Sequence, residues 1–129
     1  MFLDANVLFS AAWRPDTGLA RLWDLAGAEL VTSGYAAEEA RRNLAGEEQR
    51  ARLGDLLREV RIVPEAPDRK LPEGLDVPAK DRPILQAALA AGSTHLLTGD
   101  VRHFGPWLGR RVAGVRVLTP RRYLSGRAD

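Results

Sequence analysis

Residues 1–8 read Met-Phe-Leu-Asp-Ala-Asn-Val-Leu, a short apolar run that is interrupted by one acid and then resumes. This pattern favours a short buried strand over residues 1–3 and helix or turn from Ala5 to Trp13. An acid directly behind a buried strand loses water and must be compensated by a partner. Asp4 is therefore the first candidate for a functional residue.

Short apolar strands and amphipathic helices alternate along the remainder of the chain. Further strands are predicted over residues 30–32, 61–63, 95–98 and 115–118. Helices are predicted over residues 17–27, 33–44, 47–60, 81–91 and 120–124, with Thr17 and Ser33 as caps. Residues 64–78 hold four of the eight prolines and are predicted to be a connection. The alternation predicts an α/β fold, a three-layer α/β/α sandwich with a mainly parallel central sheet.

Length and composition predict one globular domain over residues 1–129. Apolar residues make up 45% and charged residues 28%, as in ordinary globular proteins. No apolar run is long enough to cross a membrane and no signal peptide is recognisable, so we expect a cytoplasmic protein without membrane contact. The absence of Cys excludes disulfides and thiolate metal sites, which favours hard cations held by oxygen.

The positive charge of the chain comes almost entirely from arginine. Seventeen Arg stand against Lys70 and Lys80, and the pI is about 9.5 although the net charge is only +2. Arg suits phosphate recognition, but the same bias follows from a GC-rich genome. Charge alone therefore leaves nucleic-acid binding open.

Four acids stand out by their positions relative to the predicted strands and helices. Asp4 follows the first strand, Asp100 follows the strand at 95–98, Asp81 opens the helix at 81–91, and Glu39 lies in the helix at 33–44. Sites in parallel sheets form at the carboxyl ends of strands, so these acids could converge. Three of them have a structural alternative, with Asp4 as the exception: Asp81 as a helix cap, Asp100 as a turn residue, and Glu39 with its neighbour Glu38 as a charged helix surface.

The ordered set of segments around these acids resembles a PIN domain. The segments are Leu3-Asp4-Ala5-Asn6-Val7-Leu8, Thr32-Ser33 through Glu39-Ala40-Arg41-Arg42-Asn43-Leu44, Asp81-Arg82-Pro83-Ile84-Leu85-Gln86-Ala87-Ala88, and Leu96-Leu97-Thr98-Gly99-Asp100. Leu118-Thr119-Pro120 and Tyr123-Leu124 extend the resemblance over nearly the whole chain. The chain departs from the pattern in its very short first strand and in Ala36-Ala37, where bulkier apolar residues are common.

The resemblance implies a PIN-like fold and a metal-dependent endoribonuclease that hydrolyses phosphodiester bonds of single-stranded RNA. It assigns Asp4, Glu39, Asp81 and Asp100 as catalytic residues that hold Mg²⁺ or Mn²⁺, with Glu39 preferred over Glu38. It also implies that Asn6 and Thr98 are supporting polar residues. Asn6 could instead cap a helix, and Thr98 could make an ordinary backbone contact.

The proposed chemistry explains why acids should gather. Mg²⁺ takes oxygen ligands, whereas clustered carboxylates without a cation repel one another and take up protons. A bound cation polarises the phosphoryl oxygen, activates water and stabilises the leaving oxygen. One or two ions, and Mg²⁺ or Mn²⁺, remain open.

The sequence signals for substrate-binding residues are less specific than those for the acids. The residues expected near the acids and suited to phosphate are Arg14, Arg41, Arg42, Arg82 and Arg102. Arg41 and Arg42 have the alternative of a solvated helix face, and Arg82 of a partner to a neighbouring acid. His103 is expected to be a loop residue, and Trp13 could stack on a base.

Several functional alternatives stay open at this stage. The resemblance allows a toxin with an antitoxin partner, or an RNA-processing enzyme, and it implies a homodimer. A catalytically silent PIN-like module that binds RNA or protein is the main non-enzymatic alternative. A phosphoacceptor domain is disfavoured by Val63-Pro64 and Leu118-Thr119, and a haloacid-type phosphatase by Asn6, because these positions lack the required Asp and Lys.

Overall fold

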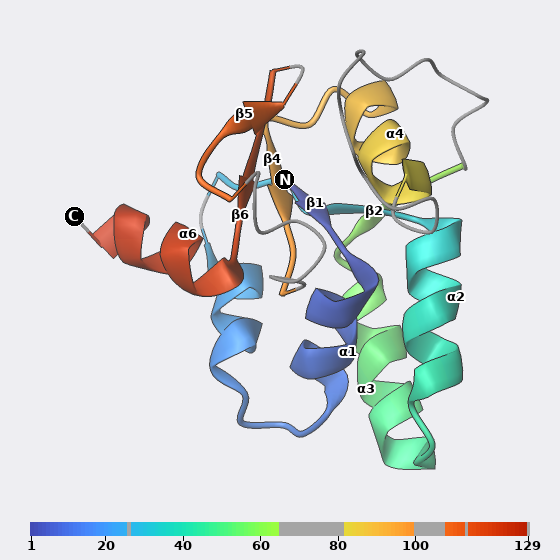
Figure 1. Ribbon diagram of the computed structural model, residues 1–129. Helices are drawn as coiled ribbons and strands as arrows, with labels where there is room; N and C mark the ends of the chain where they lie inside the picture. The colour runs from blue at the N-terminus through green and yellow to red at the C-terminus, as the bar shows by residue number, and fades with distance from the viewer. Residues whose placement is uncertain (26, 65–81, 100–107, 113, 129) are drawn as a thin grey trace.

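The computed structural model of the protein describes residues 1–25, 27–64, 82–99, 108–112 and 114–128 (Figure 1). Six strands of this part form one sheet in the order β3-β2-β1-β4-β6-β5. Their bounds are β1 Phe2–Leu3, β2 Val31–Ser33, β3 Arg61–Val63, β4 His95–Leu97, β5 Arg111–Val112 and β6 Val115–Leu118. The strands from β3 to β6 in this order are parallel, and β5 pairs antiparallel with β6.

The register between β1 and β4 separates two hydrophobic cores. Phe2 pairs with Leu96 and Leu3 pairs with Leu97. Because neighbouring residues of a strand point to opposite faces, the first pair enters one core and the second pair the other. All four side chains are completely buried, so both faces of the sheet are covered.

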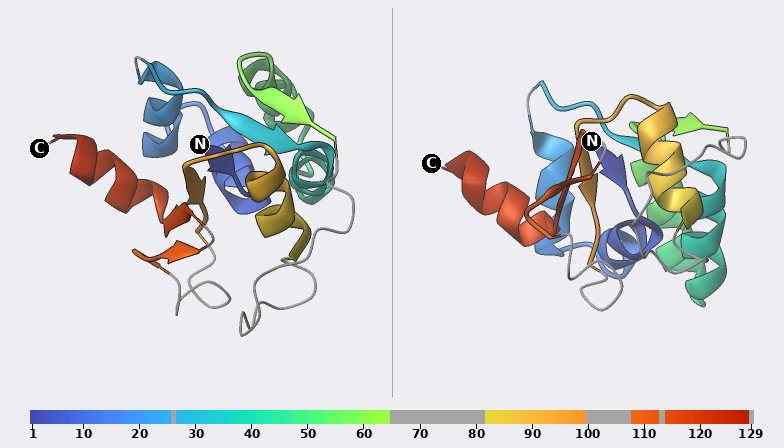
Figure 2. Two further views of the ribbon diagram at one scale, coloured as in Figure 1. Left: turned by 90° about the horizontal axis from the view of Figure 1, so that it is seen from above. Right: turned by 45° about the horizontal axis from the view of Figure 1, so that its top comes forward.

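Helices cover the two faces of the sheet. Their bounds are α1 Ala5–Ala12, η1 Gly18–Asp24, α2 Gly34–Asn43, α3 Glu47–Leu57, α4 Arg82–Ala90 and α6 Pro120–Ala128. Ile84 and Leu85 of α4 belong to the first core, whereas Leu8 of α1 and Leu53 of α3 belong to the second. The left view of Figure 2 shows α4 on one side of the strands and α3 with η1 on the other. The predicted three-layer α/β fold is confirmed.

No helix in the described part of the chain is both long and apolar enough to span a bilayer.

Several boundaries differ from those predicted from the sequence. The helix predicted at 17–27 is the 3-10 helix η1, and Thr17 provides no side-chain cap because its hydroxyl donates to the carbonyl of Ala11. The helix predicted at 47–60 ends at Leu57, while the terminal helix continues to Ala128. The cap predicted at Ser33 is confirmed, since its Oγ accepts from the backbone N–H of Ala36 at 3.0 Å. Most of the predicted connection at 64–78 lies outside the described residues.

Strand β5 was missed because two residues are too few to show a periodic pattern. Val112 is buried and pairs with Val115, and Gly114 between them has a φ of 89°. Glycine adopts this left-handed conformation without the strain that a side chain introduces.

We predict that Leu97→Ala destabilises the protein by about 2–5 kcal/mol, because it removes a fully buried side chain from a central strand. Urea unfolding followed by circular dichroism measures the change. The control is Ile62→Ala on β3, whose side chain is 50% exposed and should matter by less than about 1 kcal/mol. Equal losses in the two variants would contradict the two-core description.

Candidate active site

The carboxyl ends of β1 and β4 meet at the centre of the sheet. From β1 the chain builds β2 and β3 on one side, and it later returns to place β4 and β6 on the other. Such a change of direction leaves a crevice at the carboxyl ends of the two central strands, where ligands of parallel sheets bind. Asp4 follows β1 at this point and Thr98 follows β4.

Asp4 is a buried acid, with only 6% of its surface exposed. It is the N-cap of α1, and its Oδ1 accepts from the backbone N–H of Ala5 at 2.7 Å. Its own backbone N–H donates to the carbonyl of Leu97 at 3.0 Å, which fixes it against β4. The positive end of the helix dipole and the Ala5 N–H offset part of the loss of water by the carboxylate.

Thr98 holds the second oxygen of this carboxylate. The Thr98 side chain is completely buried, and its hydroxyl donates to Asp4 Oδ2 at 2.8 Å. The Thr98 backbone N–H donates to the carbonyl of Leu118 on β6. Thr98 therefore orients an acid, as one of its two sequence interpretations expected, and does not only end a strand.

Asn6 links the two strand ends. Its Nδ2 lies 3.4 Å from Asp4 Oδ2 and 3.3 Å from Thr98 Oγ1, and its Oδ1 accepts from the backbone N–H of Gly99 at 2.8 Å. Because Asp4 occupies the N-cap of α1, the alternative of Asn6 as a helix cap is wrong. The contact with Gly99 was missed in the sequence, since no local signal connects residues that far apart.

Glu39 and Glu38 lie in different surroundings on α2. Glu38 is exposed and forms a forked ion pair with Arg41, with 3.0 Å from Arg41 Nε to Glu38 Oε2. The hydrogen bond from Arg41 lowers the pKa of Glu38 below its usual value. Glu39 is half-buried and pairs with no residue of the described part. This difference favours Glu39 as the acid available for a ligand.

Asp81 and Asp100 lie outside the described residues, as do Arg102 and His103. The described residues beside the two acids are Arg82, the first residue of α4, and Gly99. Helix α4 ends shortly before β4 begins, so its last residues lie near the amino edge of the sheet. The first residue of α4 therefore lies toward the carboxyl edge (Figure 1). Among the described residues no three acidic or histidine side chains form a metal cluster, and only two of the four candidate acids are among them.

The candidate arginines among the described residues differ in their ion pairs. Arg41 is held by Glu38, which matches its structural alternative of a helix-surface residue. Arg14 is exposed and lies 3.7 Å from Asp16, a loose ion pair. Arg42 and Arg82 are exposed. Arg42 and Arg82 therefore remain better candidates than Arg41 for phosphate contact.

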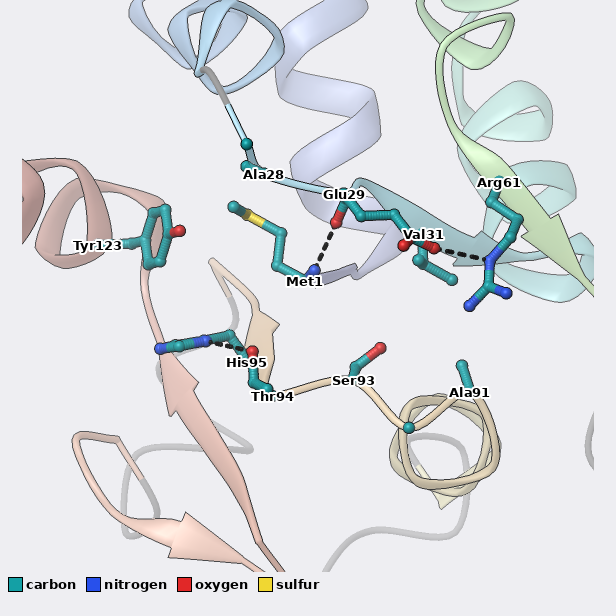
Figure 3. Close-up of a pocket in the computed structure, with 12 residues that line it drawn as sticks. Met1, Ala28, Glu29, Val31, Arg61, Ala91, Ser93, Thr94, His95 and Tyr123 are labelled. Carbon is teal, nitrogen blue, oxygen red and sulfur yellow. Dashed lines mark hydrogen bonds and ion pairs between the residues drawn. The ribbon is translucent and has the colours of Figure 1, made fainter.

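A separate cavity of about 400 Å³ lies at the opposite, amino edge of the sheet (Figure 3). Its polar side chains largely engage one another: Arg61 pairs with Glu29 at 2.9 Å, and His95 contacts the edge of the Tyr123 ring. Burial lowers the pKa of His95, and the amino-terminal charge, Arg116 and Arg111 lower it further. Asp4 and Glu39, the two candidate acids among the described residues, do not line this cavity, so it is distinct from the site around Asp4.

No family model matches the chain, and no curated protein matches it. Among solved structures, the chain is similar to one chain in the crystal structure of VapBC2 from Rickettsia felis bound to a DNA fragment from their promoter. The two superpose with a TM-score of 0.63 over 92% of this chain and 96% of the other, at 16% sequence identity. At this identity the likeness shows the fold, and the predicted PIN-like α/β/α sandwich is thereby confirmed.

Proposed function

We propose that this chain is a metal-dependent endoribonuclease that hydrolyses phosphodiester bonds of single-stranded RNA. One observation carries the proposal: Asp4 is buried at the junction of β1 and β4, and neighbouring donors hold both of its oxygens in place. Burial of a carboxylate is costly, so its retention at this crevice favours a ligand-binding role. The likeness to a VapBC2 chain supports a nuclease-like fold.

The residues present fit a hard divalent cation. The chain has no Cys, and the candidate ligands are the carboxylates of Asp4, Glu39, Asp81 and Asp100. The half-buried Glu39, unpaired within the described part, would supply a second oxygen donor from a different element. When bound, Mg²⁺ or Mn²⁺ supplies Lewis-acid stabilisation of the phosphodiester and activates the attacking water.

The protein's own groups position this chemistry. Thr98 and the N-terminus of α1 hold the Asp4 carboxylate in one orientation. Asn6 ties the backbone of Gly99, the residue before Asp100, to the same place. Arg42 and Arg82, both exposed, would attract the phosphates of the strand.

An antitoxin partner is part of the proposal, because the similar solved structure is a VapBC2 assembly. A toxin role, a homodimer and cytoplasmic location remain expectations from the sequence, beside the alternative role in RNA processing. The catalytically silent binding module remains the second candidate. Calorimetric titration with Mg²⁺ and Mn²⁺ separates it from a nuclease, since a silent module lacking the metal site takes up neither ion.

The first test is cleavage of a panel of labelled single-stranded RNAs with Mg²⁺, with Mn²⁺ and with chelator. Asp4→Asn and Asp100→Asn should each reduce the metal-dependent rate by more than about 100-fold, because loss of a ligand costs at least as much as loss of an outer partner. Folded variants that cut as fast as the wild type would refute the proposal. The chelator arm identifies any metal-independent contaminant.

The two neighbouring acids of α2 give a matched comparison. Glu39→Gln should reduce cleavage more than about 10-fold, whereas Glu38→Gln should leave it within about 2-fold, because Glu38 is exposed and engaged by Arg41. Both rates are measured at saturating metal and again at limiting metal. The opposite ranking would transfer the ligand role to Glu38.

Thr98 provides a test of positioning rather than of ligation. Thr98→Val removes the hydroxyl that holds Asp4 Oδ2 and should raise the metal concentration for half-maximal cleavage by about 10- to 100-fold. Thr98→Ser keeps the hydroxyl and should recover most of the loss. Thermal unfolding of both variants accompanies the assay. If valine and serine behave alike in metal dependence, the hydroxyl does not orient the acid.

A further inference from the structure

Trp13 stands out among the described side chains because it is large, aromatic and 49% exposed. Its ring lies against that of Phe9, with centroids 5.2 Å apart and planes tilted by 36°. Phe9 itself is partly buried against the second core. The pair therefore presents one indole to solvent on an anchored aromatic base.

The pair lies on the face of α1 that begins at the candidate active site. Ala5, Val7, Leu8, Ala11 and Ala12 are the buried residues of this helix. Asn6, Phe9 and Ser10 are its less buried residues, and Phe9 lies three residues after Asn6 and four residues before the exposed C-cap Trp13. At about 1.5 Å per residue, Phe9 lies about 7 Å and Trp13 about 13 Å along the axis from Asp4. A ligand that extends from the acids along α1 would meet these rings in turn.

The backbone that carries Trp13 is held by α3. Gln49 Nε2 and Arg52 Nη2 donate to the Trp13 carbonyl at 3.2 and 3.3 Å, and Arg52 Nε donates to the Ala12 carbonyl at 3.1 Å. These bonds satisfy carbonyls at the end of α1 that have no partner within the helix. The exposed indole thus sits on a fixed support, so a ligand would not have to order it.

Positive charge accompanies the exposed ring. Arg52 places its guanidinium at the end of α1, and the exposed Arg14 follows Trp13 directly. An aromatic ring beside guanidinium groups is the combination with which proteins hold bases and backbone of single strands. A protein partner would need a wider apolar centre. In the described part the other exposed large apolar side chain, Ile62, lies on a different element, β3.

We propose that Phe9 and Trp13 form a stacking platform for a base of the single-stranded RNA, a short distance along the strand from the bond to be cut. The proposal rests on the proposed function for the identity of the ligand. The platform would fix which bond reaches the acids, because the base seated on Trp13 sets the register of the strand. Its binding step needs no cleavage and is measurable separately.

The test measures the Kd of a labelled single-stranded RNA of about 12 nucleotides by fluorescence anisotropy, with all variants in the uncleaving Asp4→Asn background. Trp13→Ala should weaken binding by between about 5-fold and about 100-fold, and Trp13→Phe should recover most of this loss. Ile62→Ala, the control for an exposed apolar side chain, should leave the Kd unchanged. Thermal unfolding verifies that each variant is folded.

An abasic scan of the same RNA gives the decisive readout. With Trp13 present, one abasic position should weaken binding more than the others, and with Trp13→Ala that position should no longer differ. An unchanged Kd for Trp13→Ala, or an identical scan in both proteins, would overturn the platform. If Trp13→Ala instead dissociates a dimer in sedimentation while RNA affinity is unchanged, the surface belongs to a second copy and the platform is likewise refuted.

The outcomes also separate this platform from the nuclease. Trp13-dependent binding without metal-dependent cleavage by the wild type would refute the nuclease and leave the platform standing. Metal-dependent cleavage by the wild type, with the same Kd for RNA in the presence and absence of the Trp13 side chain, would support the nuclease and refute the platform.

Discussion

Strands β1 and β4, far apart in the sequence, lie side by side at the centre of the sheet, and their register sets the geometry of the whole carboxyl edge. Pairing of Leu3 with Leu97 puts the next residues of both strands, Asp4 and Thr98, at the same level, where the hydroxyl reaches the carboxylate. A slip by one residue would exchange the faces on which the leucines lie and would separate the acid from its donor. The two cores oppose this slip, because Phe2 and Leu96 are packed in one core and Leu3 and Leu97 in the other. Packing in the interior therefore protects the arrangement at the edge.

The carboxyl edge and the amino edge of the same sheet differ in how their charged groups are matched. At the amino edge, Glu29 has the guanidinium of Arg61 as a partner. At the carboxyl edge, the carboxylate of Asp4 accepts hydrogen bonds from the Ala5 N–H at the start of α1 and from the Thr98 hydroxyl. These fixed donors hold the Asp4 carboxylate in one orientation, and this geometry supports the proposed site more than the presence of acids alone.

The sequence was informative where a local pattern reports burial. The apolar residues before Asp4 identified the strand and the unusual position of its acid, and Ser33 was recognised as a cap because capping is a short-range interaction. The helical spacing at residues 17–27 predicted an α-helix, but the structure has the 3-10 helix η1 there. The Thr17 hydroxyl donates to the Ala11 carbonyl instead of capping a helix, and Gly18 has a low helix propensity. The link from Asn6 to Gly99 depends on tertiary contact, which no local pattern reveals. The resemblance preferred Glu39 over Glu38, and the structure adds that Glu38 is engaged by Arg41.

The bond between Thr98 and Asp4 spans 94 positions of the chain, and this separation has a consequence for synthesis. The ribosome makes the acid first, and the orienting hydroxyl follows 94 residues later, together with the neighbouring strand. Until β4 pairs with β1, the growing chain lacks the strand on the other side of the crevice and the hydrogen bond from Thr98 to Asp4. Such distant pairing delays completion relative to local helices. A ribosome-bound fragment ending before β4 would therefore carry Asp4 without the hydroxyl that orients it.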